Sequence, residues 1–295
     1  MALIYLVTPR FWCGTDVKRI DDQCIGVTDG RVALSEDLVG VLEEIRKENE
    51  RVGADNPDAV SVAYLVPAPK PSADGEVSAE SRLRHELQGA HIAQLQANQT
   101  EELGGKPPIR LLVANSGDGS GHWQQVVPNL LDRMNGPDRL VAVVATGNTV
   151  DATLDAIKTL RSGGLPVVMS RLAGDTSPKQ DPEELTNLRG GLARLAPSGR
   201  DQGAAAANYL RPTASRALII RDTNPEDPFV RALDESFRGT FRGDSADDTH
   251  RVLEPTETYD SQLPGVPNQM KGILLSICQQ KPDVIYFAGR NRALD

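Results

Sequence analysis

Short apolar runs alternate with amphipathic stretches along most of the chain, beginning near residue 60. The runs are rich in Val, Leu and Ile, and the stretches between them repeat apolar residues at helical spacing. Short apolar strands that alternate with amphipathic helices are typical of parallel βαβ units covered on both faces. We therefore expect strands at 60–66, 109–114, 140–146 and 165–170, and helices at 78–98, 123–134 and 150–160.

A second series of the same kind follows an interruption at residues 171–200. This segment is rich in Gly, Pro, Asp and Ser, and we interpret its part Gly191–Ser198 as a crossing between two lobes. The predicted fold class is α/β, with two doubly wound parallel-sheet lobes. In the second lobe the pattern predicts helices at 201–210, 228–241 and 267–279, and strands at 216–221, 251–253 and 283–288.

The residues before the first predicted strand are interpreted as a separate N-terminal extension, residues 1–58. Cys13 and Cys24 lie close together in its loop-like part, and a disulfide between them is plausible in an oxidising compartment. Two free thiols are the alternative, and Cys278 has no evident partner. The expected domains are thus the extension 1–58, a first lobe 59–190 and a second lobe 191–295.

Composition and charge exclude several classes of protein. The net charge of −9, from 41 acidic and 32 basic residues, does not attract nucleic acid. The sequence has no run of 18 apolar residues, so we expect no membrane span. The first residues lack the features of a signal peptide, so either the protein is cytosolic or its export signal lies outside this chain. Without a CxxC pair or an HExxH motif, we expect no zinc site.

Candidate chemistry is sought after each predicted strand, because ligands bind at the carboxyl ends of strands in open parallel sheets. The glycine-rich segment Gly117–Gly121 suggests a dinucleotide loop only weakly, and a flexible surface loop is the alternative. At Gly147–Thr149, a glycine and a helix cap would let backbone N–H groups hold a carboxylate, unless they form an ordinary N-cap. No nucleophile with a matching base is evident, so the sequence does not predict an enzyme.

Eight segments together indicate a family. They are VSVAYLVP (60–67), HELQGAHIAQLQAN (85–98), IRLLVANSGDG (109–119), VVATGNTVDATLDAIKTL (143–160), LPVVMS (165–170), RLAPSGRDQGAAAANYL (194–210), RALIIRDTNPEDPFVRALDESF (216–237) and PDVIYFAGR (282–290). Each motif is soft, but their order over some 230 residues resembles type I periplasmic binding proteins, in the branched-chain amino-acid branch of ABC-transporter receptors.

The resemblance implies two lobes, joined by hinge crossings, that close over a small ligand. Asn148 and Thr149 fall where the family often carries Ser, and Phe229 falls where a Tyr is common. Arg290 falls where an acidic residue often meets the ligand amine, a departure from the pattern of an ordinary amino-acid site. The second lobe would be incomplete. The expected ligand-binding residues are Asn115, Ser116, Gly147, Asn148, Thr149, Ser170, Asp222, Phe229, Gly289 and Arg290.

The function implied by the resemblance is that of a non-enzymatic receptor for an ABC transporter. It would hold a small polar solute, an amino acid or an amide-like compound, between its lobes, with a permease as partner, no cofactor and an extracytoplasmic location. One alternative is a sensor or interaction module of the same fold with a degenerate cleft. A remote alternative is an α/β enzyme that uses the loop 115–122 to bind a nucleotide.

Overall fold

The chain forms two compact α/β units in a computed structural model. The model describes residues 13–14, 16–68, 79–99, 107–147, 149–173, 191–223, 227–243, 249–261, 263 and 265–290. Within these ranges, the first unit holds residues 13–147, 152–171 and 191–193, and the second holds 149–151, 172–173 and 194–290. Each unit contains a largely parallel sheet, which confirms the predicted fold class.

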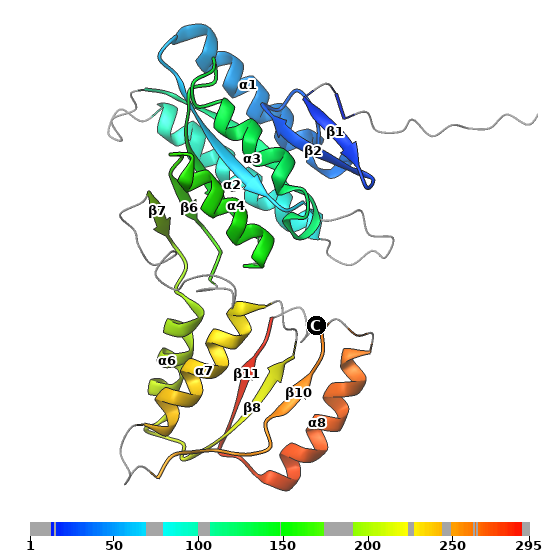
Figure 1. Ribbon diagram of the computed structural model, residues 1–295, viewed down its shortest axis with the longest axis vertical. Coiled ribbons are helices and arrows are strands. Elements are labelled where there is room, and N and C mark those ends of the chain that lie inside the picture. The colour runs from blue at the N-terminus through cyan, green and yellow to red at the C-terminus, as the bar shows by residue number, and fades with distance from the viewer. Residues whose placement is uncertain are drawn as a thin grey trace, which may run out of the picture. The chain divides into compact units, whose positions relative to one another are not determined.

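The first unit is built on a sheet with the strand order β1-β2-β4-β3-β5-β6-β7 (Figure 1). In its centre, β3 pairs in parallel with β4 and β5, and β5 pairs in parallel with β6. These are the four strands predicted from the sequence. The bounds are β1 Val17–Ile20, β2 Gln23–Thr28, β3 Val60–Val66, β4 Ile109–Asn115, β5 Leu140–Ala145, β6 Val167–Met169 and β7 Leu192–Arg194.

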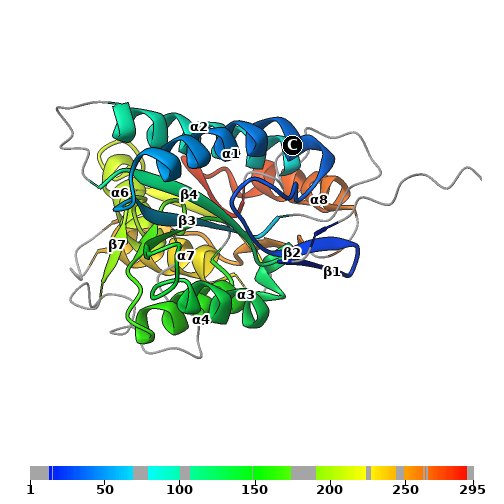
Figure 2. The same ribbon diagram turned by 90° about the horizontal axis from the view of Figure 1, so that it is seen from above.

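Helices cover both faces of this sheet, as expected for parallel strands that are apolar along their length. Figure 2 shows α1 (Val39–Asp55) and α2 (Ala79–Gln99) over one face, and α3 (Trp123–Asp132) and α4 (Asp151–Ser162) over the other. Two short 3-10 turns, Glu36–Leu38 and Asp118–Ser120, precede α1 and α3. Beneath α1 and α2 lies a core of fully buried side chains that includes Leu42, Ile45, Leu87 and Val113.

The N-terminal residues are not a separate extension in this structure. β1 and β2 form an antiparallel hairpin, and β2 pairs with β4 as part of the main sheet. Asp21 and Asp22 make its two-residue turn with φ of 46° and 62°, a conformation that Asp tolerates and that suits hairpin turns. Residues 16–58 therefore belong to the first unit, because the hairpin supplies edge strands and α1 supplies part of the core.

The second unit has a smaller sheet in which β8 (Arg216–Asp222) is the central strand. β10 (Glu257–Tyr259) and β11 (Val284–Ala288) flank it in parallel, and β9 (Arg251–Val252) also pairs with it. The helices are α6 (Gly199–Leu210), α7 (Pro228–Arg242) and α8 (Val266–Gln280). β10 was not predicted, because a strand of three residues, of which only Tyr259 is buried, carries little periodic signal.

α6 and α7 pack tightly because a glycine lies between them. An added Cβ at Gly203 would lie 2.6 Å from the carbonyl oxygen of Leu233 and 3.0 Å from the backbone nitrogen of Phe237. Phe237 is fully buried below this contact, and its ring stacks on Tyr286 with centroids 3.7 Å apart. The backbone of α7 cannot yield as a flexible side chain would, so this position requires a small residue.

We predict that Gly203→Ala lowers the free energy of unfolding by about 1–3 kcal/mol, because the new methyl group overpacks two helix backbones. Gly239→Ala in α7 is the matched control, since an added Cβ there meets no atom within 4 Å. Ala favours helix over Gly, so the control should raise stability by up to about 1 kcal/mol. Urea unfolding followed by circular dichroism measures both, and equal effects from the two variants would contradict the packing argument.

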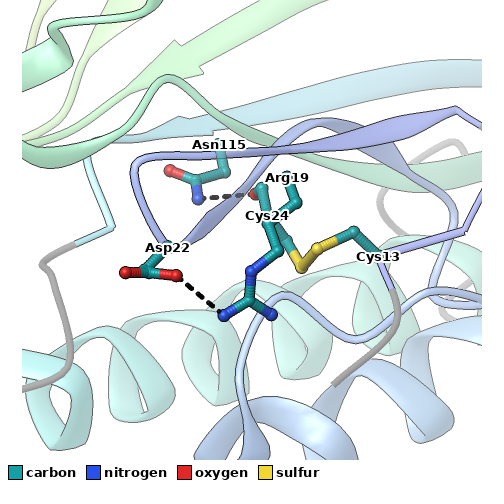
Figure 3. The surroundings of a disulfide bond; sticks show 5 residues. All are labelled: Cys13, Arg19, Asp22, Cys24 and Asn115. Carbon is teal, nitrogen blue, oxygen red and sulfur yellow. Dashed lines mark hydrogen bonds and ion pairs between the residues drawn. A yellow bond between two sulfur atoms is a disulfide. The ribbon is translucent and has the colours of Figure 1, made fainter. Parts of the chain in front are cut away.

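A disulfide joins the start of the described chain to the hairpin. The sulfur atoms of Cys13 and Cys24 are bonded (Figure 3), with their Cα atoms 5.3 Å apart. Cys278 is a free and exposed thiol. Closing this short loop restricts the unfolded chain. The double replacement Cys13→Ser and Cys24→Ser should therefore cost about 3 kcal/mol of stability.

Denaturant unfolding without reductant tests this expectation. Cys278→Ser is its matched control and should leave the unfolding midpoint unchanged, because its side chain is exposed and forms no disulfide. The reverse ranking of the two variants would show that the disulfide does not stabilise the fold.

Candidate functional site

Parallel pairing places the residues after β3, β4, β5 and β6 at one edge of the first unit's sheet. The same pairing places the residues after β8, β10 and β11 at one edge of the second unit's sheet. Ligand sites in open α/β sheets form at such carboxyl edges.

Asn115 and Ser116 were predicted to bind ligand, but the structure uses them inside the first unit. Both residues are 1% exposed. The Asn115 side-chain amide donates to the carbonyl oxygen of Cys24 at 2.9 Å (Figure 3). Its Oδ1 accepts from the backbone N–H of Ala68 at 3.1 Å and from that of Gly117 at 2.8 Å. Asn115 thus joins the disulfide-bonded strand to the loops that follow β3 and β4. These hydrogen bonds give Asn115 a supporting role in the loops, and a ligand contact by Asn115 or Ser116 stays a prediction.

The glycine-rich loop after β4 is packed against the hairpin. The backbone N–H of Asp118 donates to Gln23 Oε1 at 3.2 Å, and His122 Nε2 lies 3.3 Å from Asp21 Oδ2. A Cβ at Gly117, whose φ is +78°, would lie 2.7 Å from the His122 ring. Gly117 therefore serves a close contact within the unit, whereas an added Cβ at Gly119 would meet no atom within 4 Å.

A second polar cluster lies where β5 and β6 end. Thr146 Oγ1 donates to Glu86 Oε2 at 3.1 Å, and the guanidinium of Arg171 is paired with the same carboxylate. The hydroxyl of Tyr64 in β3 hydrogen-bonds with Ser170 and Thr146. Burial, followed by the nearby charge of Glu86, raises the pKa of Tyr64, so this phenol stays protonated at neutral pH.

Of this cluster, the sequence predicted only Ser170 as a ligand residue. Glu86 comes from the middle of α2, where no strand end marks it, so only its spacing on a helix face could have suggested it. Arg171, whose side chain is 58% exposed, follows Ser170 directly. Its exposure makes it the most accessible charged group of this cluster.

Gly147 lies beside this cluster, immediately after Thr146. With φ of +102°, it places its Cα against the Pro67 ring, where a side chain would collide. Thr149 is fully buried, and Asn148 lies outside the described residues. Gly147 therefore permits close approach of the backbone to the Pro67 ring, and its contact with a ligand stays a prediction, while Thr149 offers no exposed surface.

The second unit gathers charged and aromatic groups at its edge. Arg290 Nε and Nη2 donate to the two oxygens of Asp227 at 2.7 and 2.9 Å, and its guanidinium lies 4.6 Å from the centre of the Phe229 ring. Asp222, 4% exposed, accepts from the backbone N–H of Ser261 at 3.1 Å. The structure thus brings Phe229, Gly289 and Arg290 together and adds Asp227, which the sequence did not single out.

The described residues hold neither a cluster of metal ligands nor a membrane-spanning helix. No group of three or more His, Cys, Asp or Glu in this part of the chain has the geometry of a metal site. No helix among the same residues is long and apolar enough to cross a membrane.

We predict that Asn115→Ala lowers the free energy of unfolding by about 2–4 kcal/mol, because two buried N–H groups and one carbonyl lose their partner. Ser116→Ala is the neighbouring control. Its hydroxyl makes only long contacts, of 3.2 Å to Val66 O and 3.4 Å to Ser120 Oγ, so we expect less than about 1 kcal/mol. Guanidinium unfolding compares the two, and a negligible effect of Asn115→Ala would argue against its supporting role.

Comparison with known proteins places this fold. No family model matches the chain, and no curated protein matches it in sequence. Among solved structures, a putative branched-chain amino acid ABC transporter protein from Rhodospirillum rubrum matches with 16% identity and a TM-score of 0.51, over 80% of this chain and 59% of that one. An ABC transporter substrate-binding protein from Desulfitobacterium hafniense, in complex with Leu, matches with 14% identity and a TM-score of 0.50, over 80% and 59%.

The chain spans about three fifths of the length of these two proteins. At this level of identity the likeness concerns the fold alone. This chain therefore has the fold of ABC-transporter substrate-binding proteins of the branched-chain amino-acid kind.

Proposed function

We propose that the protein is a non-enzymatic solute-binding receptor for an ABC transporter. It would hold a small polar ligand, an amino acid or an amide-like compound, at the carboxyl edges of its sheets. The observation that carries this proposal is the gathering of hydroxyl, guanidinium and carboxylate groups at the carboxyl edge of each unit, in a fold shared with substrate-binding proteins. One of the two similar structures contains Leu, which supports a ligand of this size.

In the first unit, we propose that Gly147 and Ser170 contact the ligand, with Arg171 beside them. Gly147 exposes its backbone, and the Ser170 hydroxyl is half-buried while it donates to Ala145 O at 3.2 Å. A hydroxyl that donates internally still has lone pairs with which to accept from a ligand N–H. In the second unit, we propose Phe229, Gly289 and Arg290 as ligand contacts.

We also propose an extracytoplasmic location and a permease as the partner. The disulfide between Cys13 and Cys24 supports this location, because disulfides form and persist in oxidising compartments. No cofactor is needed for reversible solute binding.

One observation favours the alternative of a sensor or interaction module with a degenerate site. Arg290, Asp227 and Phe229 already contact one another, so part of the second edge is filled by the protein's own side chains. A receptor and a degenerate module differ in whether any small solute stabilises the folded chain.

Thermal unfolding with a panel of amino acids and small amides tests the receptor proposal. A ligand at about 100 times its Kd adds about 2.7 kcal/mol to stability, which should raise Tm by about 5–10 °C. Ser170→Ala should weaken binding of that ligand about five- to tenfold through loss of one hydrogen bond.

Thr159→Ala is the control for this variant, because the Thr159 hydroxyl only donates to Asp155 O within α4, at 2.8 Å. It should leave the affinity unchanged. If no solute shifts the Tm of a chain shown to be folded, the receptor proposal fails and the degenerate module is favoured.

A further inference from the structure

β11 is an outer strand of the second unit's sheet, and its outer side has no partner strand among the described residues. The strand order β10-β8-β11 leaves only β8 beside it, in parallel register from Val284 to Ala288 (Figure 1). The backbone N–H and C=O groups on the outer side of such a strand are a template on which another strand can pair. The sequence of β11 decides whether this template is protected.

Outer strands of stable sheets are usually short or carry charged side chains, which discourage pairing with other molecules. Four outer strands in the described residues follow this rule: β1, β7, β9 and β10 have four residues or fewer, and each contains a charged residue. β11 is different, because its five residues, Val-Ile-Tyr-Phe-Ala, include neither a charge nor a proline. This strand therefore lacks the usual protection against pairing.

One face of β11 is also left open to solvent. Tyr286 stacks on Phe237 of α7, so the alternation of side chains places Ile285 and Phe287 on the opposite face of the sheet. On that face, Phe287 stacks with Tyr259 and packs with residues of α8. Helix α8 nevertheless leaves Ile285 47% exposed. The outermost apolar side chain on this face thus lies uncovered beside an unpaired backbone.

α8 adds two exposed leucines on the same side of the sheet. The helix buries Ile273 against β8 and β10, but Leu274 and Leu275 are exposed. A single exposed aliphatic side chain is ordinary on a protein surface, whereas several on one side of a small sheet are typical of an interaction surface. The apolar side chains and the unpaired strand both indicate a protein partner for this side of the second unit.

A second copy of the same chain fits this strand. In antiparallel pairing about a two-fold axis at Tyr286, Ile285 of each copy lies opposite Phe287 of the other, and Val284 lies opposite Ala288. All five residues of β11 are then paired. Aromatic and β-branched side chains that face each other across two strands stabilise a sheet, and the two-fold axis makes this contact twice.

The local charges are compatible with this register. The charged residues nearest to β11 are Asp283 and Arg290, one at each end of the strand, and they have opposite sign. With the axis at Tyr286, Asp283 lies opposite Gly289 of the second copy, so no two like charges face each other. The net charge of −9 on each chain acts over a longer range, where salt screens the repulsion.

We propose that β11 is a dimerisation strand, which pairs antiparallel with β11 of a second copy and joins the two second-unit sheets into one continuous sheet. Ile285 is the central apolar contact of this interface. The proposal goes beyond the receptor function and needs no ligand. Its failure therefore leaves the solute-binding proposal untouched, and the reverse also holds.

Sedimentation velocity of the full chain between about 1 and 100 μM, at about 0.15 M salt, tests the proposal. We expect a species of twice the chain's mass that grows with concentration. Hydrogen exchange over the same range locates the contact, because the backbone N–H groups of β11 should exchange more slowly in the dimer. A chain that stays monomeric throughout overturns the proposal and leaves β11 for a strand of different sequence, as does a dimer in which exchange of β11 is unchanged.

Ile285→Lys gives β11 the charge that the other outer strands have, and the two-fold axis repeats the change in both copies. It should weaken dimerisation at least about tenfold. Ile285→Thr keeps a β-branched residue and should produce a smaller loss in the same direction, which guards against misfolding of the lysine variant.

Ile92→Lys is the matched control for the lysine variant. Ile92 lies in α2 of the first unit and is 54% exposed, close to the exposure of Ile285. It should leave the monomer–dimer equilibrium unchanged. If both lysine variants weaken association equally, or if Ile285→Lys and Ile285→Thr are folded and dimerise as the original chain does, β11 is not the dimer contact.

Discussion

Parallel pairing is the constraint on which the candidate ligand edges of both units depend. When β3 pairs in parallel with β4 and β5, and β5 with β6, the loops after all four strands emerge at one edge. β8 has the same relation to β10 and β11. Residues far apart in sequence, such as Asp227 and Arg290, therefore become neighbours without any local signal. The core holds these strands in place, since parallel strands need apolar cover on both faces.

Loops at such an edge need support, and buried amides supply it in the first unit. Asn115 bonds to three different backbone segments, one of which carries the disulfide. Asn49 does the same at the opposite end of β4, where it pairs with both the N–H and the C=O of Leu111. An amide carries donors and an acceptor in one group, so it can satisfy unlike backbone groups that an apolar side chain would leave unpaired. The edge of this sheet is consequently stiffened from inside the fold.

Hydrophobic periodicity predicted the central strands and most helices, because burial imposes that period directly on the sequence. It missed the β1–β2 hairpin, although the pair Asp21 and Asp22 between two β-rich segments was a usable turn signal. The candidate site was harder to predict. A polar residue after a strand can face a ligand or the protein, and Asn115 faces the protein. Glu86 reaches the edge from a helix, and the pairing of Arg290 with Asp227 follows only from the fold.

The two edges differ in which polar groups they leave unused, and that difference determines what each can recognise. In the first unit, the Glu86 carboxylate binds Thr146 and Arg171, and the hydroxyls of Ser170 and Thr146 retain lone pairs. In the second unit, Asp227 Oδ1 accepts from Arg290 and from two backbone N–H groups of α7, while Asp227 Oδ2 accepts from Arg290 alone and the buried Tyr259 hydroxyl has no hydrogen-bond partner in the described part of the chain. Counting residue types would class both edges as mixed and polar. Counting unused donors and acceptors distinguishes them, because a ligand binds only through groups that the fold has not already paired.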